Sequence, residues 1–225
     1  MSTFQRARSE DQREARRQAI LQTAAGMLAE MPVSAVSLNE LSRRVGLAKS
    51  NVLRYFDSRE AVLLDLLVQL AGDFFTQVGQ QLPEAVEAHG PVRARAEGVA
   101  AALSATLAAH PTLCELLSVQ AGVLEHNVSA ETVAKYKRDG YNSLAGFTGV
   151  LRQVLPEFSE EEAAEATRTI VVFAGALWTH ANPPRSVRDA YAADPSLVFL
   201  PEGFAGSLER TISIVLMGLL ADKAE

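Results

Sequence analysis

The sequence predicts an all-α fold of about nine helices. Apolar residues recur at the i, i+3, i+4, i+7 spacing that gives a helix one buried face. Serine followed three residues later by glutamate, a pattern that caps helix N-termini, occurs more than once, and proline or glycine stands near the ends of the apolar stretches. No segment shows a convincing strand-like alternation of apolar and polar residues, and no internal repeat is present.

Composition places the chain among globular proteins. It has 225 residues, of which 48% are hydrophobic and 6% aromatic, enough for one or two domains. Its single cysteine, Cys114, permits no intramolecular disulfide, which favours a reducing, cytoplasmic location. The polar N-terminal residues lack the apolar stretch of a secretory signal. The longest apolar runs, 170–177 and 212–221, are shorter than the roughly 20 residues that span a bilayer, so we expect no membrane segment.

Charge is divided unevenly along the chain. The whole sequence has 21 basic and 27 acidic residues, a net charge of −6. Residues 1–60 hold ten of the basic and seven of the acidic side chains, a net charge of +3, so the rest carries −9. This asymmetry indicates a nucleic-acid-binding end, although a solvated basic face gives the same pattern.

The N-terminal region predicts a helix-turn-helix. A first helix over 13–30 carries a stripe of apolar residues. Ser37 and Glu40 form a capping box for a short helix, and Gly46 supplies the left-handed turn after it. A second short helix over 48–55 completes the helix-turn-helix.

A long apolar helix over 58–82 follows, and Pro83 is expected to end it. At 1.5 Å per residue its length is about 36 Å, enough to belong to two domains. The segment 182–203, rich in proline, aspartate and alanine, is expected to separate the last two helices. The remaining helices are expected over 92–109, 111–125, 130–155, 160–181 and 204–221.

Residues 46–63, GLAKSNVLRYFDSREAVL, resemble the TetR family of bacterial transcriptional regulators, as do residues 37–45 and the alanine-rich first helix. The match covers about residues 15–65. It is specific, because the caps, the turn glycine and the start of the fourth helix recur in the family's order and spacing. Two positions differ from the common pattern: Leu53 replaces a phosphate-contacting tyrosine, and Arg59 replaces a lysine. The arginine keeps the charge, whereas the leucine cannot donate a hydrogen bond.

This resemblance implies a homodimer that binds a double-stranded, pseudo-palindromic DNA operator. The DNA-binding domains, residues 1–60, would place the helix over 48–55 in successive major grooves. Residues 61–225 would form the dimer and hold a pocket for a small, largely apolar effector of unknown identity.

The helix over 48–55 and its flanks supply the candidate DNA-binding residues. Its first residues, Lys49, Ser50 and Asn51, are suited to base edges, and Asn51 can pair bidentately with adenine. The flanking side chains are suited to contact DNA phosphates, because such contacts depend on the charge and length of a side chain. These phosphate candidates are Ser37, Arg43, Arg44, Arg54, Tyr55 and Arg59.

Two features of this region have a second interpretation. Tyr55 is as well suited to core packing as to DNA, and Phe56 is expected in the core. A flexible basic arm, from Arg6 to Arg17, either tracks the DNA backbone or minor groove, or merely aids solubility.

Two helices of the second domain are too hydrophobic on all sides to lie on a solvated monomer. Residues 170–178 and 212–220 therefore predict a four-helix interface between two copies, formed by the helices near 160–181 and 204–221, with an intrachain core as the alternative. Candidate ligand-binding side chains are apolar and equally suited to a core. They are Phe74, Leu103, Leu117, Phe147, Phe173 and Trp178.

No catalytic or cofactor-binding motif is present in the sequence. His110 and Cys114 lie four residues apart, as metal ligands on one helix do, but no second pair exists and His110-Pro111 is typical of a helix start. We therefore expect no enzyme, no cofactor and no metal site.

The sequence thus predicts a cytoplasmic, dimeric, sequence-specific DNA-binding regulator, a repressor that an effector releases by changing the spacing of its recognition helices. The helix over 58–82 would carry this change because it belongs to both domains. Two alternatives stay open: a small-molecule carrier or sensor that acts through a protein partner, and a helical enzyme. Contacts to about 6–10 phosphates would make affinity fall steeply with salt, which a protein partner need not do.

Overall fold

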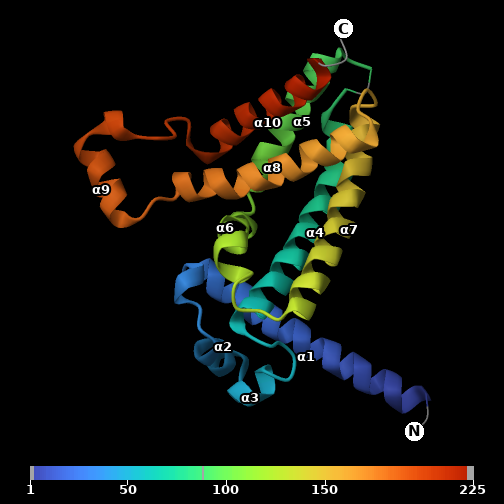
Figure 1. Ribbon diagram of the computed structural model, residues 1–225, viewed down its shortest axis with the longest axis vertical. Coiled ribbons are helices and arrows are strands. Elements are labelled where there is room, and N and C mark those ends of the chain that lie inside the picture. Colours follow the sequence, from blue (N-terminus) through green and yellow to red (C-terminus); the bar gives the residue numbers. More distant parts are fainter. Residues whose placement is uncertain (1–2, 88, 222–225) are drawn as a thin grey trace.

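A computed structural model describes residues 3–87 and 89–221, with side chains from residue 10 onward. All regular elements in these ranges are helical, which confirms the all-α prediction, and there are ten α-helices where about nine were expected. Figure 1 shows their arrangement. The α-helices are α1 (Thr3–Glu30), α2 (Leu38–Val45), α3 (Lys49–Val52), α4 (Arg59–Ala85), α5 (Val92–Ala108), α6 (Pro111–Val119), α7 (Ala130–Val154), α8 (Glu160–Ala181), α9 (Arg185–Ala193) and α10 (Gly203–Ala221).

Helices α1, α2 and α3 pack together at one end of the molecule. The predicted caps form: the Ser37 side chain accepts from the Glu40 N–H at 3.2 Å, and Gly46 adopts the left-handed conformation with φ 72°. Phe56 is buried as expected, beside Val52 and Leu41 in the core of this end.

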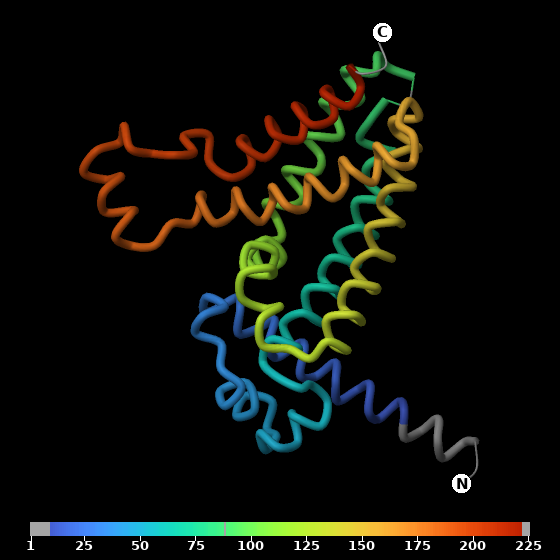
Figure 2. Tube along the Cα trace, viewed as in Figure 1, coloured from blue at the N-terminus to red at the C-terminus, as the bar shows by residue number. Residues whose placement is uncertain are grey.

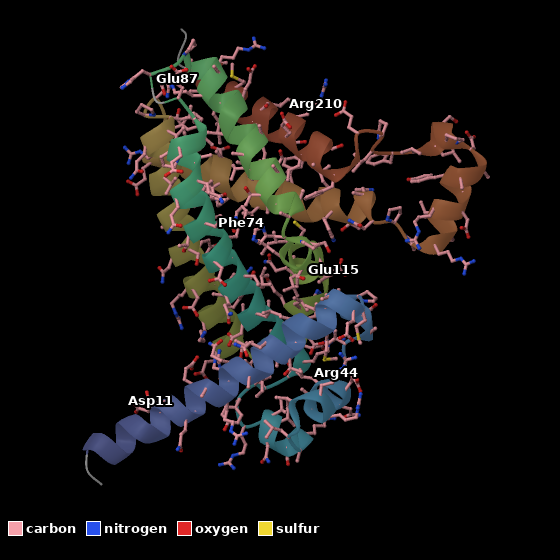
Figure 3. The ribbon with its side chains drawn as sticks, turned by 180° about the vertical axis from the view of Figure 1, so that it is seen from behind. Asp11, Arg44, Phe74, Glu87, Glu115 and Arg210 are labelled. Carbon is pink, nitrogen blue, oxygen red and sulfur yellow. The ribbon has the colours of Figure 1, made fainter. Side chains whose placement is uncertain are left out.

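The prediction of a flexible basic arm is wrong for the backbone that the structure describes. Helix α1 is continuous from Thr3, ten residues earlier than expected, and its N-terminal half extends beyond the body, where Figure 3 labels Asp11. Hydrophobic periodicity detects only helices that bury an apolar stripe. The N-terminal half of α1 buries none, so the sequence did not indicate that this half is helical. The side chains of Arg6 and Arg8 lie outside the described residues.

Helix α4 runs from the DNA-binding end into the rest of the molecule, alongside α7 (Figure 2). Ser58 caps it by accepting from the Ala61 N–H at 3.1 Å. It continues through Pro83 to Ala85 rather than ending before the proline. Pro83 has no N–H to donate to the carbonyl of Gly79 four residues earlier, so this proline removes a single helical hydrogen bond, close to the end of the helix.

The second half of the molecule is built around α4, α5, α6, α7, α8 and α10. Helix α7 packs against α4 and α8, α6 packs against α8, and α10 packs against α5 and α8. A single π-helical turn, Gln120–Leu124, continues α6. The predicted capping box of α8 is complete, with Ser159 and Glu162 each bonded to the other's backbone N–H.

Arg95 is the principal buried charge of this part. Its guanidinium donates to the carbonyls of Gly90 at 3.1 Å and Val154 at 2.6 Å, and it pairs with the Glu157 carboxylate. These bonds tie the start of α5 to the end of α7. Full hydrogen bonding is what makes a buried guanidinium tolerable.

Residues 182–203 form a projecting arm and not a simple linker. The arm contains α9 and a 3-10 turn, Pro195–Leu197, none of whose residues is buried, and it extends away from the body at the end of α8 and α10 (Figure 1). Helix α9 was missed because it is only nine residues long and lies in a segment whose proline and aspartate content predicted a linker.

By length and composition, α4 and α10 are apolar enough to cross a membrane, and α5 with α6 would add a third, bent span. The expectation from uninterrupted apolar runs was therefore too strict, because these helices keep a high mean hydropathy over 18 residues although polar residues interrupt their apolar runs. Helix α4 is covered by protein on several sides, whereas only 17% of the apolar window of α10 is buried. The uncovered face of α10 thus requires another partner.

The crossing of α6 and α8 depends on Gly175. A Cβ atom built there would lie 2.9 Å from the carbonyl oxygen of Leu117, which is backbone and cannot rotate away. We expect Gly175→Ala to lower the free energy of unfolding by about 1–3 kcal/mol, measured by urea denaturation.

Gly146→Ala is the matched control, because a Cβ atom at that helical position on α7 meets nothing within 4 Å. It should raise the stability by about 0.5–1 kcal/mol through helix propensity. Equal effects of the two substitutions would contradict the close packing at Gly175.

Candidate DNA-binding surface and ligand cavity

The helix-turn-helix presents a short second helix. Helix α3 spans Lys49–Val52 and is shorter than the expected 48–55. Beyond it the chain continues in tighter turns, with the Arg54 N–H bonded to the Asn51 carbonyl at 3.2 Å and the Tyr55 N–H to the Val52 carbonyl at 2.9 Å. The chain must turn here because Ser58 starts α4 only a few residues later.

The side chains of Lys49, Ser50 and Asn51 are exposed on α3, and Val52 is buried beneath them. Leu53 is also exposed, and Tyr55 is half-buried against the core. The base-contact candidates therefore stand together on one solvent-facing surface.

Arg43 and Arg44 are both held by Glu40. Arg43 donates to the Glu40 carboxylate at 2.6 and 2.9 Å, and Arg44 donates to it at 2.8 Å and to Glu30 at 2.7 Å. Hydrogen bonds from Arg43 and then Arg44 lower the pKa of Glu40 to about 2. Glu40 thus neutralises two phosphate candidates, and its side chain does not complete the predicted capping box. Figure 3 shows Arg44 at this end of the molecule.

Arg59 is less available to DNA than the sequence suggested. It donates to the Val36 carbonyl at 3.0 Å and pairs with Glu60 at 2.8 Å, so it links the start of α4 to the loop before α2. Its charge is largely engaged within the protein.

A basic groove, not anticipated from the sequence, lies between α1 and the chain after α3. Arg13 and Arg16 from α1 line it together with Arg54 and Tyr55. Arg17 points elsewhere, since it pairs with Asp65 of α4 and lies 4.6 Å from the centre of the Phe56 ring. The spacing of Arg13 and Arg16 on one helical face was the available signal.

Three polar contacts join α7 to the loop before α4 and to the first part of α4. Asp57 accepts hydrogen bonds from Ser129 at 3.0 Å and Thr132 at 2.9 Å, at the N-terminus of α7. Lys135 of α7 contacts Asp65 of α4 at 3.4 Å. The loop before α4 is therefore attached to α7 as well as to α4.

An apolar cavity of about 260 Å³ lies among α4, α5, α6, α7 and α8. Four of the six ligand candidates line it: Phe74, Leu103, Leu117 and Phe147. Figure 3 shows Phe74 on α4 in the middle of the molecule. The volume of the cavity is slightly below the usual range for small-molecule sites.

Two of the six ligand candidates, Phe173 and Trp178, do not line this cavity. Phe173 is 41% exposed on α8. The Trp178 indole donates to Glu115 at 3.0 Å, and its ring packs edge-on against Phe204 at 5.0 Å. Periodicity places residues on a helix but does not fix how α8 is rotated, and that rotation directs these side chains away from the cavity.

Part of the cavity lining is polar, which no sequence pattern indicated. Gln120, Tyr136, Lys137 and Arg168 lie around the cavity with the apolar residues. Lys137 pairs with Glu125 at 2.6 Å. Burial opposes ionisation of Glu125, but hydrogen bonds from Gln120 and Lys137 hold its pKa below the ordinary value. The π-helical turn is what brings Gln120 and Glu125 to α7, and no sequence pattern signals such a turn.

His110 and Cys114 have separate structural roles. The His110 Nδ1 atom lies 2.7 Å from the Thr106 carbonyl, and the Cys114 Sγ atom lies 3.3 Å from the Leu107 carbonyl. Among the described residues, no group of three or more His, Cys, Asp or Glu side chains could hold a metal ion.

A helix-turn-helix attached by a long shared helix to a larger helical domain defines a class of DNA-binding transcriptional regulators. The family model described as "Bacterial regulatory proteins, tetR family" matches residues 20–66, and the model described as "Tetracyclin repressor-like, C-terminal domain" matches residues 68–223. The chain belongs to the TetR family, as the sequence motif predicted. Members of this family are transcriptional regulators and not enzymes.

Solved structures share this fold. A TetR transcriptional regulator from Rhodococcus sp. RHA1 is 17% identical, with a TM-score of 0.55 over 94% of this chain and 98% of that one. A possible TetR family regulator from Streptomyces coelicolor A3(2) is 22% identical, with a TM-score of 0.58 over 92% and 100%. The fatty acid degradation regulator FadR from Bacillus halodurans is 18% identical, with a TM-score of 0.51 over 91% and 96%. No curated protein sequence matches this chain significantly.

Cys114 offers a test of the packing beside the cavity. Burial raises the pKa of its thiol to about 12, so almost no reactive thiolate exists at pH 8, well below that pKa. We expect Ellman's reagent to leave the native protein unlabelled and to label it within minutes in urea, followed by absorbance. Cys114→Ser is the blank, since no other cysteine is present. Rapid labelling of native protein would contradict the packing around α6.

Proposed function

We propose that this chain is a cytoplasmic, homodimeric repressor that binds a pseudo-palindromic operator and is released by a small, largely apolar effector. The observation that carries the proposal is a single helix, α4, which starts seven residues after the end of the exposed helix α3 and lines the apolar cavity. We take residues 1–60 as the DNA-binding domain and 61–225 as the effector and dimerisation domain.

In this proposal Lys49, Ser50 and Asn51 read base edges, because they are the exposed residues at the start of the recognition helix. Asn51 is the best candidate for specificity, since its amide can both donate to and accept from adenine. Phosphate contacts come from two sets of residues. The predicted set is Ser37, Arg43, Arg44, Arg54, Tyr55 and Arg59, and the groove adds Arg13 and Arg16.

Effector binding would alter the distance between the two recognition helices of a dimer. Half-sites one helical turn apart, about 34–36 Å, tolerate little change in that distance. Filling the cavity beside Leu67, Ala71 and Phe74 would shift α4, and the loop at Asp57 would move with it. The ligand must bind the low-affinity conformation better for this to happen.

The dimer interface would use the outer faces of α8 and α10. Val172 and Ile214 are 68% and 63% exposed there, next to Phe173. The arm 182–203 continues both helices and adds exposed Leu197 and Phe199, so the same interface would extend along it. A second copy of the chain accounts for all these apolar side chains at once.

The DNA-binding proposal is tested by Asn51→Ala on DNA from immediately upstream of the reading frame. Loss of one bidentate base contact should weaken operator binding by about 1–3 kcal/mol and bring it closer to the level on random DNA. Fluorescence anisotropy of labelled DNA at two salt concentrations is the measurement. Asn142→Ala, an exposed asparagine on α7, is the control and should leave affinity unchanged.

Two results together would overturn the operator proposal. The wild type would bind the upstream DNA no more tightly than random DNA, and selection from random oligonucleotides would enrich no sequence. Binding of a protein partner without the steep salt dependence of phosphate contacts would instead favour the small-molecule carrier or sensor.

The interface proposal is tested by the double variant Phe173→Glu/Ile214→Glu. Two carboxylates in an apolar interface should weaken dimerisation at least about tenfold, because they lose hydration without a partner. Light scattering coupled to size-exclusion chromatography measures the mass. Val123→Glu is the control, since Val123 is also 41% exposed but lies on the π-helical turn. A double variant that stays as dimeric as the wild type would show that the interface lies elsewhere.

A further inference from the structure

The cavity has a charge character opposite to that of the domain around it. Residues 61–225 carry a net charge of −9. Yet among the described residues that line the cavity, the charged side chains are Lys137 and Arg168, and no carboxylate lines it. The charged side chains that line the cavity are therefore both cationic.

The two cations are not equivalent. The Lys137 ammonium is already paired with Glu125 at 2.6 Å. Arg168 on α8 is exposed and forms no hydrogen bond or ion pair with any described residue. Its guanidinium is thus available to a ligand, and it can offer two parallel donors to a carboxylate.

A further donor lies on α7. Tyr136 lines the cavity and is buried, and its hydroxyl bonds to no described residue. Because buried phenols usually find a partner, this O–H is suited to a ligand's polar group. Tyr136, Lys137 and Arg168 are therefore the donors that surround one apolar space.

The cavity is also elongated. Its lining on α7 extends from Tyr136 to Phe147, about 16 Å at the helical rise. Buried Phe74, Leu103 and Phe147 line its interior, whereas Tyr141 and Arg168 are exposed and mark its mouth. This shape suits a chain with one polar end.

We propose that the effector is an anionic amphiphile, an alkyl chain that ends in a carboxylate, with the chain among Phe74, Leu103 and Phe147 and the carboxylate at Arg168. The inference rests on the proposed function for the role of the cavity, and it adds the chemical class of the ligand. A cationic amphiphile is disfavoured because Arg168, the charged side chain at the cavity without an ion-pair partner among the described residues, would repel its head.

The test uses three probes that share a decyl chain: decanoate, decanol and decyltrimethylammonium. Isothermal titration calorimetry on the full chain without DNA measures binding of each, at concentrations below micelle formation. We expect decanoate to bind about tenfold or more tightly than decanol, as one charge-assisted hydrogen bond allows, and the ammonium to bind most weakly.

Arg168→Gln should abolish the preference for decanoate over decanol and leave decanol binding unchanged. Arg138→Gln removes the same charge from an exposed position on α7 that does not line the cavity, and it should keep the preference. Equal binding of the three probes, tighter binding of the ammonium, or an equal loss in both variants would overturn the proposal.

The same samples separate this inference from the proposed function. Operator affinity is measured by anisotropy without any probe, so it tests DNA recognition alone. No binding of any probe by a protein that still binds its operator would overturn the ligand class only. Decanoate binding that depends on Arg168 but leaves operator affinity unchanged would support the ligand class and overturn effector release.

Discussion

One helix, α4, must be covered by two sets of neighbours at once. Its buried residues run from Ala61 to Leu82, and it packs against α1 at the DNA-binding end and against α5, α6 and α7 beyond it. A packed helix is displaced as a unit more readily than it is bent, because its hydrogen bonds and close-packed side chains resist local deformation. The position of the helix-turn-helix relative to the cavity is therefore set by how α4 sits between these neighbours.

Helix α7 supplies a second connection between the same two regions. Its N-terminus is held by Asp57 through Ser129 and Thr132, and its cavity residues Tyr136 and Lys137 begin one turn later. A ligand contact at that turn lies about 6 Å along the helix from the hydrogen bonds that hold the loop before α4. Two connections restrict the motion of the DNA-binding end more than one would. A modest shift of α4 or α7 at the cavity would therefore move the DNA-binding end in a defined direction.

Local signals predicted much of this structure, and tertiary arrangement accounts for what they missed. The caps at Ser37, Ser58 and Ser159 and the left-handed Gly46 depend on residues within one turn, so sequence alone reveals them. Four cavity side chains followed from helical periodicity in the same way. The directions of Phe173 and Trp178, by contrast, depend on the rotation of α8, and the lining position of Arg168 depends on the same rotation.

Ion pairing also changes the meaning of the basic N-terminal region. Its net charge of +3 suggested arginines ready for phosphates, but Glu40 and Glu30 hold Arg43 and Arg44, and Arg59 is bonded to Val36 and Glu60. Phosphate contact by Arg43 or Arg44 would require sharing or leaving a carboxylate, which offsets part of the electrostatic gain. Within residues 10–60, four basic side chains form no ion pair with any described residue: Arg13, Arg16, Lys49 and Arg54. In the proposed complex this arrangement would weaken non-specific attraction to DNA, and base contacts from α3 would then contribute a larger share of the total affinity.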